Sequence, residues 1–310
     1  MLKYDLPQKF ENWIAKKNWV LRPHQIEVLN NPERQSQLLI APTGSGKTLA
    51  GFLPTLIELE AFDFTGLHTI YVSPLKALAS DIRRNLMIPI EEMNLNIRVE
   101  DRTGDTKAGT KRRQRVDPPH ILLTTPESLA LLISFPESKN LFANLKRIII
   151  DEIHALIESK RGHQLVLAIS RLQSLCNNLH KIGLSATVDR PKELAEFICE
   201  KNANCPIIFA KSGVDPDISM LKTKAAPPWA GAGATYSIPD VLEQISSHKT
   251  TLIFHNTRAQ AEIFFHNLWL NNKNNLPIAI HHGSLDLDQR KRVEEAISRG
   301  ELKAVVCTGT

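Results

Sequence analysis

Residues 41–48 read APTGSGKT, a glycine-rich loop that ends in a lysine and a hydroxyl residue. In such a loop, glycines let backbone N–H groups wrap around phosphates, the lysine reaches the β and γ phosphates, and the hydroxyl ligates Mg²⁺. Gly44 and Gly46 supply the bends, and Lys47 and Thr48 take the last two roles. The loop predicts a nucleotide site with the residues Thr43, Gly44, Ser45, Gly46, Lys47 and Thr48. A chance glycine-rich turn that opens a helix is the alternative.

A pair of carboxylates lies within RIIIDEIH, residues 147–154. Hydrolysis of a phosphoanhydride depends mostly on positioning and charge neutralisation. We therefore expect Asp151 to hold Mg²⁺ through water and Glu152 to polarise the attacking water. Lys47, Asp151 and Glu152 are the predicted catalytic residues, and Thr48 and Asp151 are the predicted metal-binding residues. Two surface acids in an ion pair are the alternative, and His154 taken alone is more often a packed core histidine than a catalyst.

Short apolar, β-rich runs precede these motifs, and a helical pattern follows each run. The runs cover residues 37–41, 69–74, 97–99, 120–126, 147–152, 181–187 and 206–210. Strands that are apolar on both faces and alternate with helices indicate a parallel sheet covered on both sides. Ligands of such sheets bind beyond the carboxyl ends of the strands. The letters APTGSGKT, SPLKA, TTPES, DEIH and SAT stand at those ends, so the sequence predicts an α/β fold with its site at that edge.

The 310 residues suggest about two domains. The pattern lapses from 211 to about 240 into a stretch rich in Pro, Gly and Ala. Alternation resumes with strands at 250–257, 278–283 and 304–310 and helices at about 259–270 and 287–299. We predict a first domain over 1–212, an interdomain crossing over 213–240 and the start of a second domain over 241–310. Because a parallel sheet needs more strands than this, we expect the second domain to be incomplete and the natural protein to continue.

Composition sets further expectations. The formal net charge of +5 is compatible with a polyanionic partner without proving one. The four cysteines have no zinc spacing and form no C-x-x-C pair, so we expect reduced, mostly buried thiols of a cytosolic protein. No apolar run approaches the roughly 18 residues of a membrane span, and the start of the chain lacks a signal-peptide core. The sequence therefore predicts a cytoplasmic chain with no membrane segment.

Two further stretches invite a binding role. His281 and His282 could suggest a metal pair, but no third ligand has a sensible spacing, so we expect no metal other than Mg²⁺. The basic run TKAGTKRRQR, residues 106–115, could contact nucleic acid, but a solvated helical face is at least as plausible from the pattern.

Eight motifs follow one another along the chain: APTGSGKT, SPLKAL, TTPESL, DEIH, LSAT, IFHNTR, HHGS and CTGT. Motifs of these types in this order resemble those of a superfamily 2 DExH-box helicase. Longer segments resemble the Lhr-type helicases, and among them the bacterial ligase-associated DEXH-box DNA repair helicases. These segments are WVLRPHQ, SPLKALASDIRRNL, RTGDT, DPPHILLTTPESLALL, SKRG, DPDISML, TLIFHNTRAQAE and LPIAIHHGSLD.

The resemblance implies two RecA-like P-loop lobes that close on ATP while single-stranded nucleic acid lies across both. Arg22 and Gln25 would contact the adenine. The residues implied along the nucleic acid are Pro74, Lys76, Thr103, Gly104, Thr125, Pro126, Glu127 and Ser128 in the first lobe and Thr257, Arg258, Gly283 and Ser284 in the second. The residues implied in coupling nucleotide state to lobe movement are His154, Ser185, Ala186 and Thr187. Hydroxyls, amides and isolated basic residues suit contacts to phosphate and sugar, and simple loop capping is the alternative for each.

We therefore expect the ATP- and Mg²⁺-dependent motor of a DNA repair helicase or translocase, monomeric and moving 3′ to 5′ on single strands or tailed duplexes. Its context by resemblance includes a DNA ligase or nuclease. Alternatives are an RNA or RNA–DNA hybrid helicase, an incompetent module that binds ATP and nucleic acid, and a P-loop ATPase with no nucleic-acid role. Gly309 stands where we expect a serine, and the arginine-finger motif of the superfamily does not appear before the chain ends. We thus expect ATP binding with poor hydrolysis.

Overall fold

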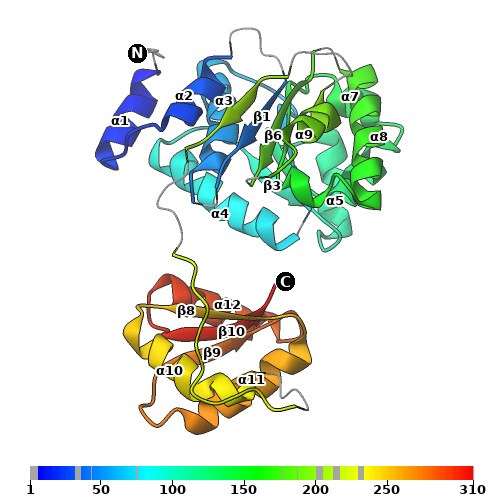
Figure 1. Ribbon diagram of the computed structural model, residues 1–310. Helices are drawn as coiled ribbons and strands as arrows, with labels where there is room; N and C mark the ends of the chain where they lie inside the picture. The colour runs from blue at the N-terminus through cyan, green and yellow to red at the C-terminus, as the bar shows by residue number, and fades with distance from the viewer. Residues whose placement is uncertain are drawn as a thin grey trace. The chain divides into compact units, whose positions relative to one another are not determined.

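The computed structural model describes residues 6–31, 36–42, 44–74, 76–176, 178–186, 188–199, 205–211, 217–229 and 234–309, with only the backbone at 76–81 and 287. The chain divides into two compact units, Met1–Asp215 and Pro216–Thr310. Figure 1 shows that each unit consists of strands flanked by helices.

The first unit is built on a seven-stranded parallel sheet with the order β3-β4-β2-β5-β6-β1-β7. The strands are β1 Gln37–Ile40, β2 Thr69–Val72, β3 Val99–Arg102, β4 Ile121–Thr124, β5 Arg147–Ile150, β6 His180–Ser185 and β7 Ile207–Phe209. The helices are α1 Gln8–Lys16, α2 Pro23–Leu29, α3 Lys47–Ala61, α4 Lys76–Glu92, α5 Ala108–Val116, α6 Pro126–Ile133, α7 Ser138–Phe142, α8 Lys160–Leu175 and α9 Pro191–Ile198, with the 3-10 turn η1 Ile153–Ala155.

Both faces of this sheet are buried, as the apolar strands predicted. Alternate residues of a strand point to opposite faces, and the first core cluster includes Leu39, Tyr71 and Ile149 together with residues of α1 to α4. The second cluster includes Ile40 and Ile150 together with residues of α6 to α9. The predicted α/β class, a parallel sheet with helices on both sides, is therefore confirmed for this unit (Figure 1).

Strand β3 overlaps the predicted run at 97–99 only at Val99 and continues through charged residues to Arg102. β3 is an edge strand that pairs only with β4. Arg102 is buried, and its guanidinium donates to Lys111 O at 2.9 Å and to Gln114 Oε1 at 3.2 Å. These tertiary hydrogen bonds stabilise the buried Arg102 charge. A search for apolar runs in the sequence cannot identify a strand that contains such a charged residue.

The second unit has a three-stranded parallel sheet with the order β8-β10-β9. Its elements are η2 Thr235–Ser237, α10 Ile238–Ser247, β8 Thr251–His255, α11 Arg258–Asn271, β9 Ile278–His281, α12 Leu287–Ser298 and β10 Ala304–Thr308. Residues of α10, α11, β9 and β10 form its core. Helix α10 begins at Ile238, within the stretch that was predicted as an interdomain crossing. Pro239 lies in its first turn, where proline is compatible with a helix start.

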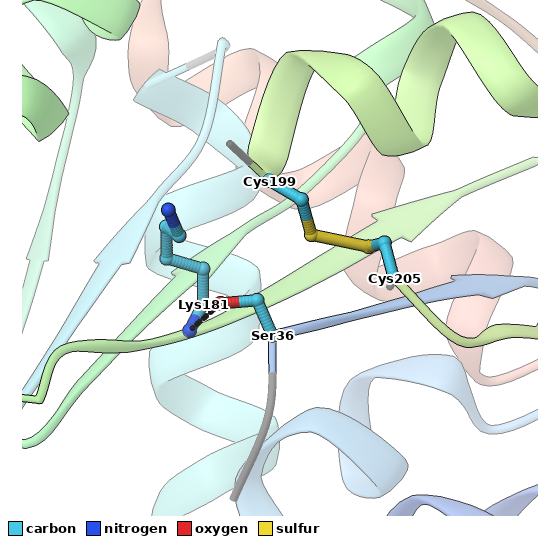
Figure 2. Close-up of a disulfide and its surroundings, with 4 residues drawn as sticks. All are labelled: Ser36, Lys181, Cys199 and Cys205. Carbon is cyan, nitrogen blue, oxygen red and sulfur yellow. Dashed lines mark hydrogen bonds between the residues drawn. A yellow bond between two sulfur atoms is a disulfide. The ribbon is translucent and has the colours of Figure 1, made fainter. Parts of the chain in front are cut away.

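Two of the four cysteines do not remain thiols, contrary to the sequence prediction. Cys199 at the end of α9 and Cys205 before β7 form a disulfide (Figure 2). The fold places their Cα atoms 6.2 Å apart, which is within the usual range for such a bond. A separation of six residues carries no recognisable spacing signal. Cys176 and Cys307 are buried free thiols, as predicted.

No helix within the described ranges combines the length and the apolar character that a membrane crossing requires.

A buried ion pair connects α3 to the start of β5. The Arg147 guanidinium, 2% exposed, donates to Glu58 Oε1 and Oε2 at 3.0 and 3.1 Å. His68 Nε2 lies 3.2 Å from Glu58 Oε2. Burial by itself would raise the pKa of the Glu58 carboxyl, but the His68 hydrogen bond and the Arg147 charge outweigh burial and hold that pKa well below its usual range.

Replacing Arg147 with alanine should lower the free energy of unfolding by about 3–5 kcal/mol, because the Glu58 charge would stay buried without the guanidinium that pairs with it. The matched control is Arg190→Ala, which removes an exposed pair with Glu193 and should change stability by less than about 1 kcal/mol. Urea unfolding of both variants measures the difference. Equal effects in the two variants would contradict a dominant role for the buried pair.

Stability should also fall in acid through Glu58. Its pKa is lower in the folded state than the reference value of 4.5, so the folded protein binds this proton more weakly than the unfolded chain. The contribution is therefore complete above about pH 5 and is lost as pH decreases below the reference value. Urea unfolding between neutral pH and pH 3 should show a smaller acid loss in Glu58→Gln than in the unmodified chain. An identical pH dependence would exclude this explanation.

Candidate nucleotide site and nucleic-acid surface

Parallel strands place the candidate residues of the first unit at one edge of the sheet. Register pairs Ile40 with Ser185 and Val72 with Ile150, and the Asp151 N–H donates to Val72 O at 2.9 Å. The loops that follow β1, β2, β4, β5 and β6 therefore begin at the same edge. This arrangement brings the phosphate loop, the carboxylate pair and Ser185 into one region, as the strand-end argument predicted.

The phosphate loop has the backbone that its glycines allow. Gly44 and Gly46 have φ of +76° and +79°, values that side chains with a Cβ rarely adopt. A Cβ on Gly46 would also lie 2.8 Å from Gln25 Nε2. Helix α3 begins at Lys47, directly after the loop, so the free N–H groups of its first turn are available to an anion. Thr43 lies outside the described residues.

One polar atom of the loop fits a phosphate cradle independently of the motif. The Ser45 hydroxyl is buried and has no hydrogen-bond partner in the part of the chain that the structure describes. A buried polar group without a partner is costly. Phosphate oxygens at this loop would supply acceptors for it.

Three residues at the start of α2 support three consecutive carbonyls of the loop. Arg22 Nη1 donates to Gly44 O at 3.1 Å, and Gln25 Nε2 donates to Gly46 O at 3.2 Å. Between them, His24 Nε2 lies 3.1 Å from Ser45 O, to which it can only donate. Burial lowers the pKa of His24, which favours the neutral ring. Sequence reasoning missed His24, because nothing in its spacing distinguishes a loop support from a core histidine.

The two residues implied in adenine binding line a cavity of about 410 Å³ beside the loop. Trp19 lies on the same wall and is 52% exposed. Gln25 Oε1 accepts from the Arg22 N–H at 2.9 Å, so both ends of the Gln25 amide are engaged within the protein. The volume lies within the range of small-ligand pockets.

The carboxylate pair and the loop lysine meet directly. Lys47 Nζ lies 2.7 Å from Glu152 Oε1, and these side chains are only 11% and 23% exposed. The Asp151 carboxyl is buried, and its two oxygens accept hydrogen bonds from the Tyr71 hydroxyl and from the Glu152 N–H. Burial raises the pKa of Asp151, and the Tyr71 hydrogen bond and the Lys47 charge oppose that shift. Tyr71 was not predicted from the sequence, because it stands there as one apolar residue of a buried strand.

This arrangement fits a hydrated Mg²⁺ better than a metal held by protein alone. Asp151 contributes a buried carboxylate, and Thr48 is half-buried in the first turn of α3. Within the described ranges no group of three or more His, Cys, Asp or Glu residues could hold a metal. Mg²⁺ usually takes one or two carboxylates and completes its shell with waters and substrate phosphates. Thr48 and Asp151 are compatible with that pattern.

His154 connects the carboxylate pair to the end of β6. Its Nδ1 lies 3.4 Å from Glu152 Oε2 and 3.2 Å from Ser185 Oγ. The side chain is 36% exposed, so His154 is not the packed core histidine of the alternative interpretation. Ala186 follows Ser185 and is half-buried, and Thr187 lies outside the described residues.

The hydroxyls implied in nucleic-acid contact in the first unit also stabilise their own loops. Thr125 is the N-cap of α6 and accepts from the Ser128 N–H. Thr103 Oγ1 accepts from the Asp105 N–H at 3.3 Å. These bonds are the loop capping that we considered as the alternative, and they hold the hydroxyls in fixed places.

The other residues of this set differ in their surroundings. Lys111 Nζ donates to Gly104 O at 2.9 Å. Glu127 forms a two-pronged pair with Arg161, one bond of which measures 3.1 Å. Glu127 therefore binds Arg161. A direct contact of Glu127 with a phosphate is unfavourable, because both groups are negatively charged. Pro74, just after β2, and Pro126, the first residue of α6, are buried, and the Lys76 side chain is outside the description.

The four residues implied in the second unit gather at two neighbouring loops. Thr257 caps α11 by accepting from the Gln260 N–H at 3.2 Å. Arg258 Nη1 donates to Ser284 Oγ at 2.5 Å, and a Cβ on Gly283 would lie 3.7 Å from Arg258 Nη2. The structure therefore joins IFHNTR to HHGS through Arg258.

The adjacent histidines pair with acids. His282 Nε2 lies 2.7 Å from Glu262 Oε1, and His281 Nε2 lies 3.1 Å from Glu294 Oε1.

Basic side chains of α5 contact neighbouring residues of the first unit. Arg113 pairs with Glu100 at 2.6 Å, and the Arg115 guanidinium lies 4.1 Å from the centre of the Phe135 ring. The described contacts therefore favour the solvated helical face over a dedicated nucleic-acid patch.

A phosphate loop between β1 and α3, with a carboxylate pair at the end of β5 in a parallel sheet, defines a P-loop nucleotide-binding protein of RecA-like architecture. The family model described as DEAD/DEAH box helicase matches residues 22–196, and the model described as helicase conserved C-terminal domain matches residues 236–310. The chain belongs to the DEAD/DEAH box helicase family.

Within that family the chain is similar to Lhr-type helicases. It is 38% identical to ATP-dependent helicase Lhr-Core protein 2 of Thermococcus barophilus over 92% of this chain and 36% of that protein. It is 39% identical to ATP-dependent helicase Lhr-Core of Methanothermobacter thermautotrophicus over 87% of this chain and 34% of that protein. The chain thus spans about a third of the length of these curated relatives.

A solved structure gives the same result. The structure of Mycobacterium smegmatis helicase Lhr bound to ssDNA and AMP-PNP superposes with a TM-score of 0.81 and 31% identity, over 98% of this chain and 41% of that chain. The predicted resemblance to superfamily 2 helicases of the Lhr type is confirmed. The two RecA-like units, each built on a parallel sheet, agree with the predicted fold class.

His24→Ala should weaken binding of a fluorescent ATP analogue about tenfold, because the buried Ser45 carbonyl would lose its donor at a cost of about 1–3 kcal/mol. His24→Gln should retain most of the affinity, since its amide can donate to the same oxygen. The control is His163→Ala on the exposed face of α8. Unchanged affinity in a folded His24→Ala protein would show that the loop does not need this support.

Proposed function

We propose that this chain carries the motor of an ATP-dependent helicase or translocase that acts on single-stranded nucleic acid. The observation that carries the proposal is the buried contact between Lys47 and Glu152 at 2.7 Å, beside Asp151. It joins the phosphate-binding loop to the carboxylate pair at the edge of one sheet. Similarity to ATP-dependent Lhr-Core helicases over most of the chain supports the same conclusion.

The Lys47–Glu152 pair suggests how the site responds to ATP. The terminal phosphate of ATP would attract the Lys47 ammonium and draw it away from Glu152 Oε1. Glu152 would then be free to accept a proton from the water that attacks the γ phosphate. Thr48 and Asp151 would hold Mg²⁺, which neutralises phosphate charge when bound. Arg22 and Gln25 would contact the adenine from the neighbouring cavity.

The contacts of His154 support a role in coupling. The histidine lies within 3.4 Å of Glu152 and 3.2 Å of Ser185. A change in the charge or position of Glu152 during ATP hydrolysis would therefore reach the loop after β6. We propose that this loop, Ser185 to Thr187, passes nucleotide state to the relative movement of the two lobes.

We propose single-stranded DNA, or a duplex with a single-stranded tail, as the substrate, with movement from 3′ to 5′. The M. smegmatis helicase Lhr structure contains ssDNA, and its similarity to this chain supports the choice of DNA. The contacts would come from the loops that carry Thr103, Thr125, Thr257 and Arg258, through the threonine hydroxyls and the Arg258 guanidinium, to phosphate and sugar. A monomeric state and a role in DNA repair remain predictions.

The experiment combines binding and turnover. Lys47→Ala should weaken ATP-analogue binding at least about tenfold, because it removes the cation that faces the phosphates. Glu152→Gln should keep binding while lowering DNA-stimulated hydrolysis by about 100-fold or more, the usual contribution of a general base. The matched controls are Lys192→Ala and Glu196→Gln on the exposed face of α9.

Several outcomes decide the assignment. Stimulation by RNA in place of DNA would change the substrate. ATP binding without turnover in the presence of either polymer would favour a module that binds ATP and nucleic acid without hydrolysis. If neither DNA nor RNA changes the ATP affinity or the turnover, the result would contradict a nucleic-acid motor.

A further inference from the structure

Tyr71 lies in the middle of β2, where its side chain is completely buried. Its hydroxyl donates a hydrogen bond to Asp151 Oδ2 at the end of the adjacent strand β5. Tyr71 has Ile149 as its register partner, so the phenol ring extends along the sheet toward the residue two positions further along β5. The Tyr71 hydroxyl, which belongs to a residue inside the sheet, therefore lies at Asp151 in the candidate magnesium site.

Packing alone does not explain this hydroxyl. The ring stacks on Phe52 of α3, with centroids 5.3 Å apart and planes at 27°, inside the first core cluster. Phenylalanine would fill that space without burying a polar group, which is costly unless the group is hydrogen-bonded. The Tyr71 hydroxyl finds its acceptor in Asp151, so the contact between the two is the reason that a hydroxyl is tolerated there.

The Asp151 carboxylate is held at both oxygens. Oδ2 accepts from Tyr71, and Oδ1 accepts from the Glu152 N–H at 2.8 Å. Two donors from different directions determine the plane of the carboxylate, while an ionised carboxylate has about four lone-pair sites. The remaining lone pairs therefore have fixed directions.

The same packing extends to the other candidate metal ligand. Phe52 follows Thr48 by four residues on α3, so the two side chains lie on the same face of that helix. The Phe52–Tyr71 stack therefore connects the helix that carries Thr48 with the hydroxyl that orients Asp151.

We propose that Tyr71 is a positioning residue for the magnesium site, acting through Asp151 and without touching the nucleotide. The inference rests on the proposed function, because it needs a metal bound between Asp151 and the nucleotide phosphates. Groups that hydrogen-bond to a metal ligand orient it, and their loss usually lowers metal affinity by about 10- to 100-fold.

The experiment is a Mn²⁺ titration of the whole chain in the presence of a non-hydrolysable ATP analogue, followed by electron paramagnetic resonance. Tyr71→Phe should raise the Mn²⁺ dissociation constant at least about tenfold. Analogue affinity in EDTA, which reports the loop without metal, should stay within about twofold of the unmodified chain. A general packing defect would reduce both quantities, so the split between them is specific to a positioning role.

Two further variants complete the test. Tyr236→Phe removes a hydroxyl from the second unit and should leave both quantities unchanged. Phe52→Leu disturbs the ring stack but keeps the Tyr71 hydroxyl, and it should reduce Mn²⁺ affinity less than Tyr71→Phe. Thermal unfolding of each variant verifies that it is folded.

A Mn²⁺ affinity of Tyr71→Phe within twofold of the unmodified chain, while Asp151→Asn loses that affinity, would overturn the proposal. An effect of Phe52→Leu as large as that of Tyr71→Phe would also overturn it, since packing would then account for the loss. An unmodified chain that binds neither the analogue nor Mn²⁺ would instead contradict the proposed function.

Discussion

A carboxylate buried at the end of a central strand is the constraint on which the first unit depends. Asp151 is only 3% exposed, and a charge in that position must be matched by hydrogen bonds or opposite charge. The fold supplies a phenol from β2, a backbone N–H from Glu152 and the Lys47 ammonium nearby. Each donor comes from a different segment, so the environment of Asp151 exists only when β2, β5 and α3 are assembled.

The two elements that carry this chemistry are tied together at both ends. Lys47 at the start of α3 contacts Glu152 just after β5, and Glu58 near the end of the same helix contacts Arg147 at the start of the same strand. The Arg147 pair lies at the amino end of the strand, away from the phosphate loop. A helix and a strand joined at two points keep a fixed register, which is what a site needs when a small misplacement weakens it. The Arg147–Glu58 ion pair therefore joins α3 to β5 at the end of the strand opposite the site.

Support of the phosphate loop follows the same logic. Arg22, His24 and Gln25 donate to three consecutive carbonyls, so the phosphate loop is held through its carbonyl oxygens. Hydroxyls such as Thr125 and Thr257 cap the helices that follow their loops. Capping does not compete with a later contact to a phosphate, because the capping hydroxyl accepts through its oxygen and its O–H can still donate to a phosphate oxygen.

The amino-acid sequence by itself determined the parallel α/β class, the strand ends at which Lys47, Asp151 and Ser185 stand, and the resemblance to helicases. These features are local, because apolar runs, glycines and polar residues indicate structure from only a few neighbouring positions. Only the tertiary structure decided the rest. The contacts of Tyr71 with Asp151, His24 with Ser45 and Glu127 with Arg161 join residues far apart in the chain. The Cys199–Cys205 bond and the charged continuation of β3 depend equally on where neighbouring elements lie. A buried polar group is stabilised by whichever partner the fold brings to it, and no local pattern encodes that partner.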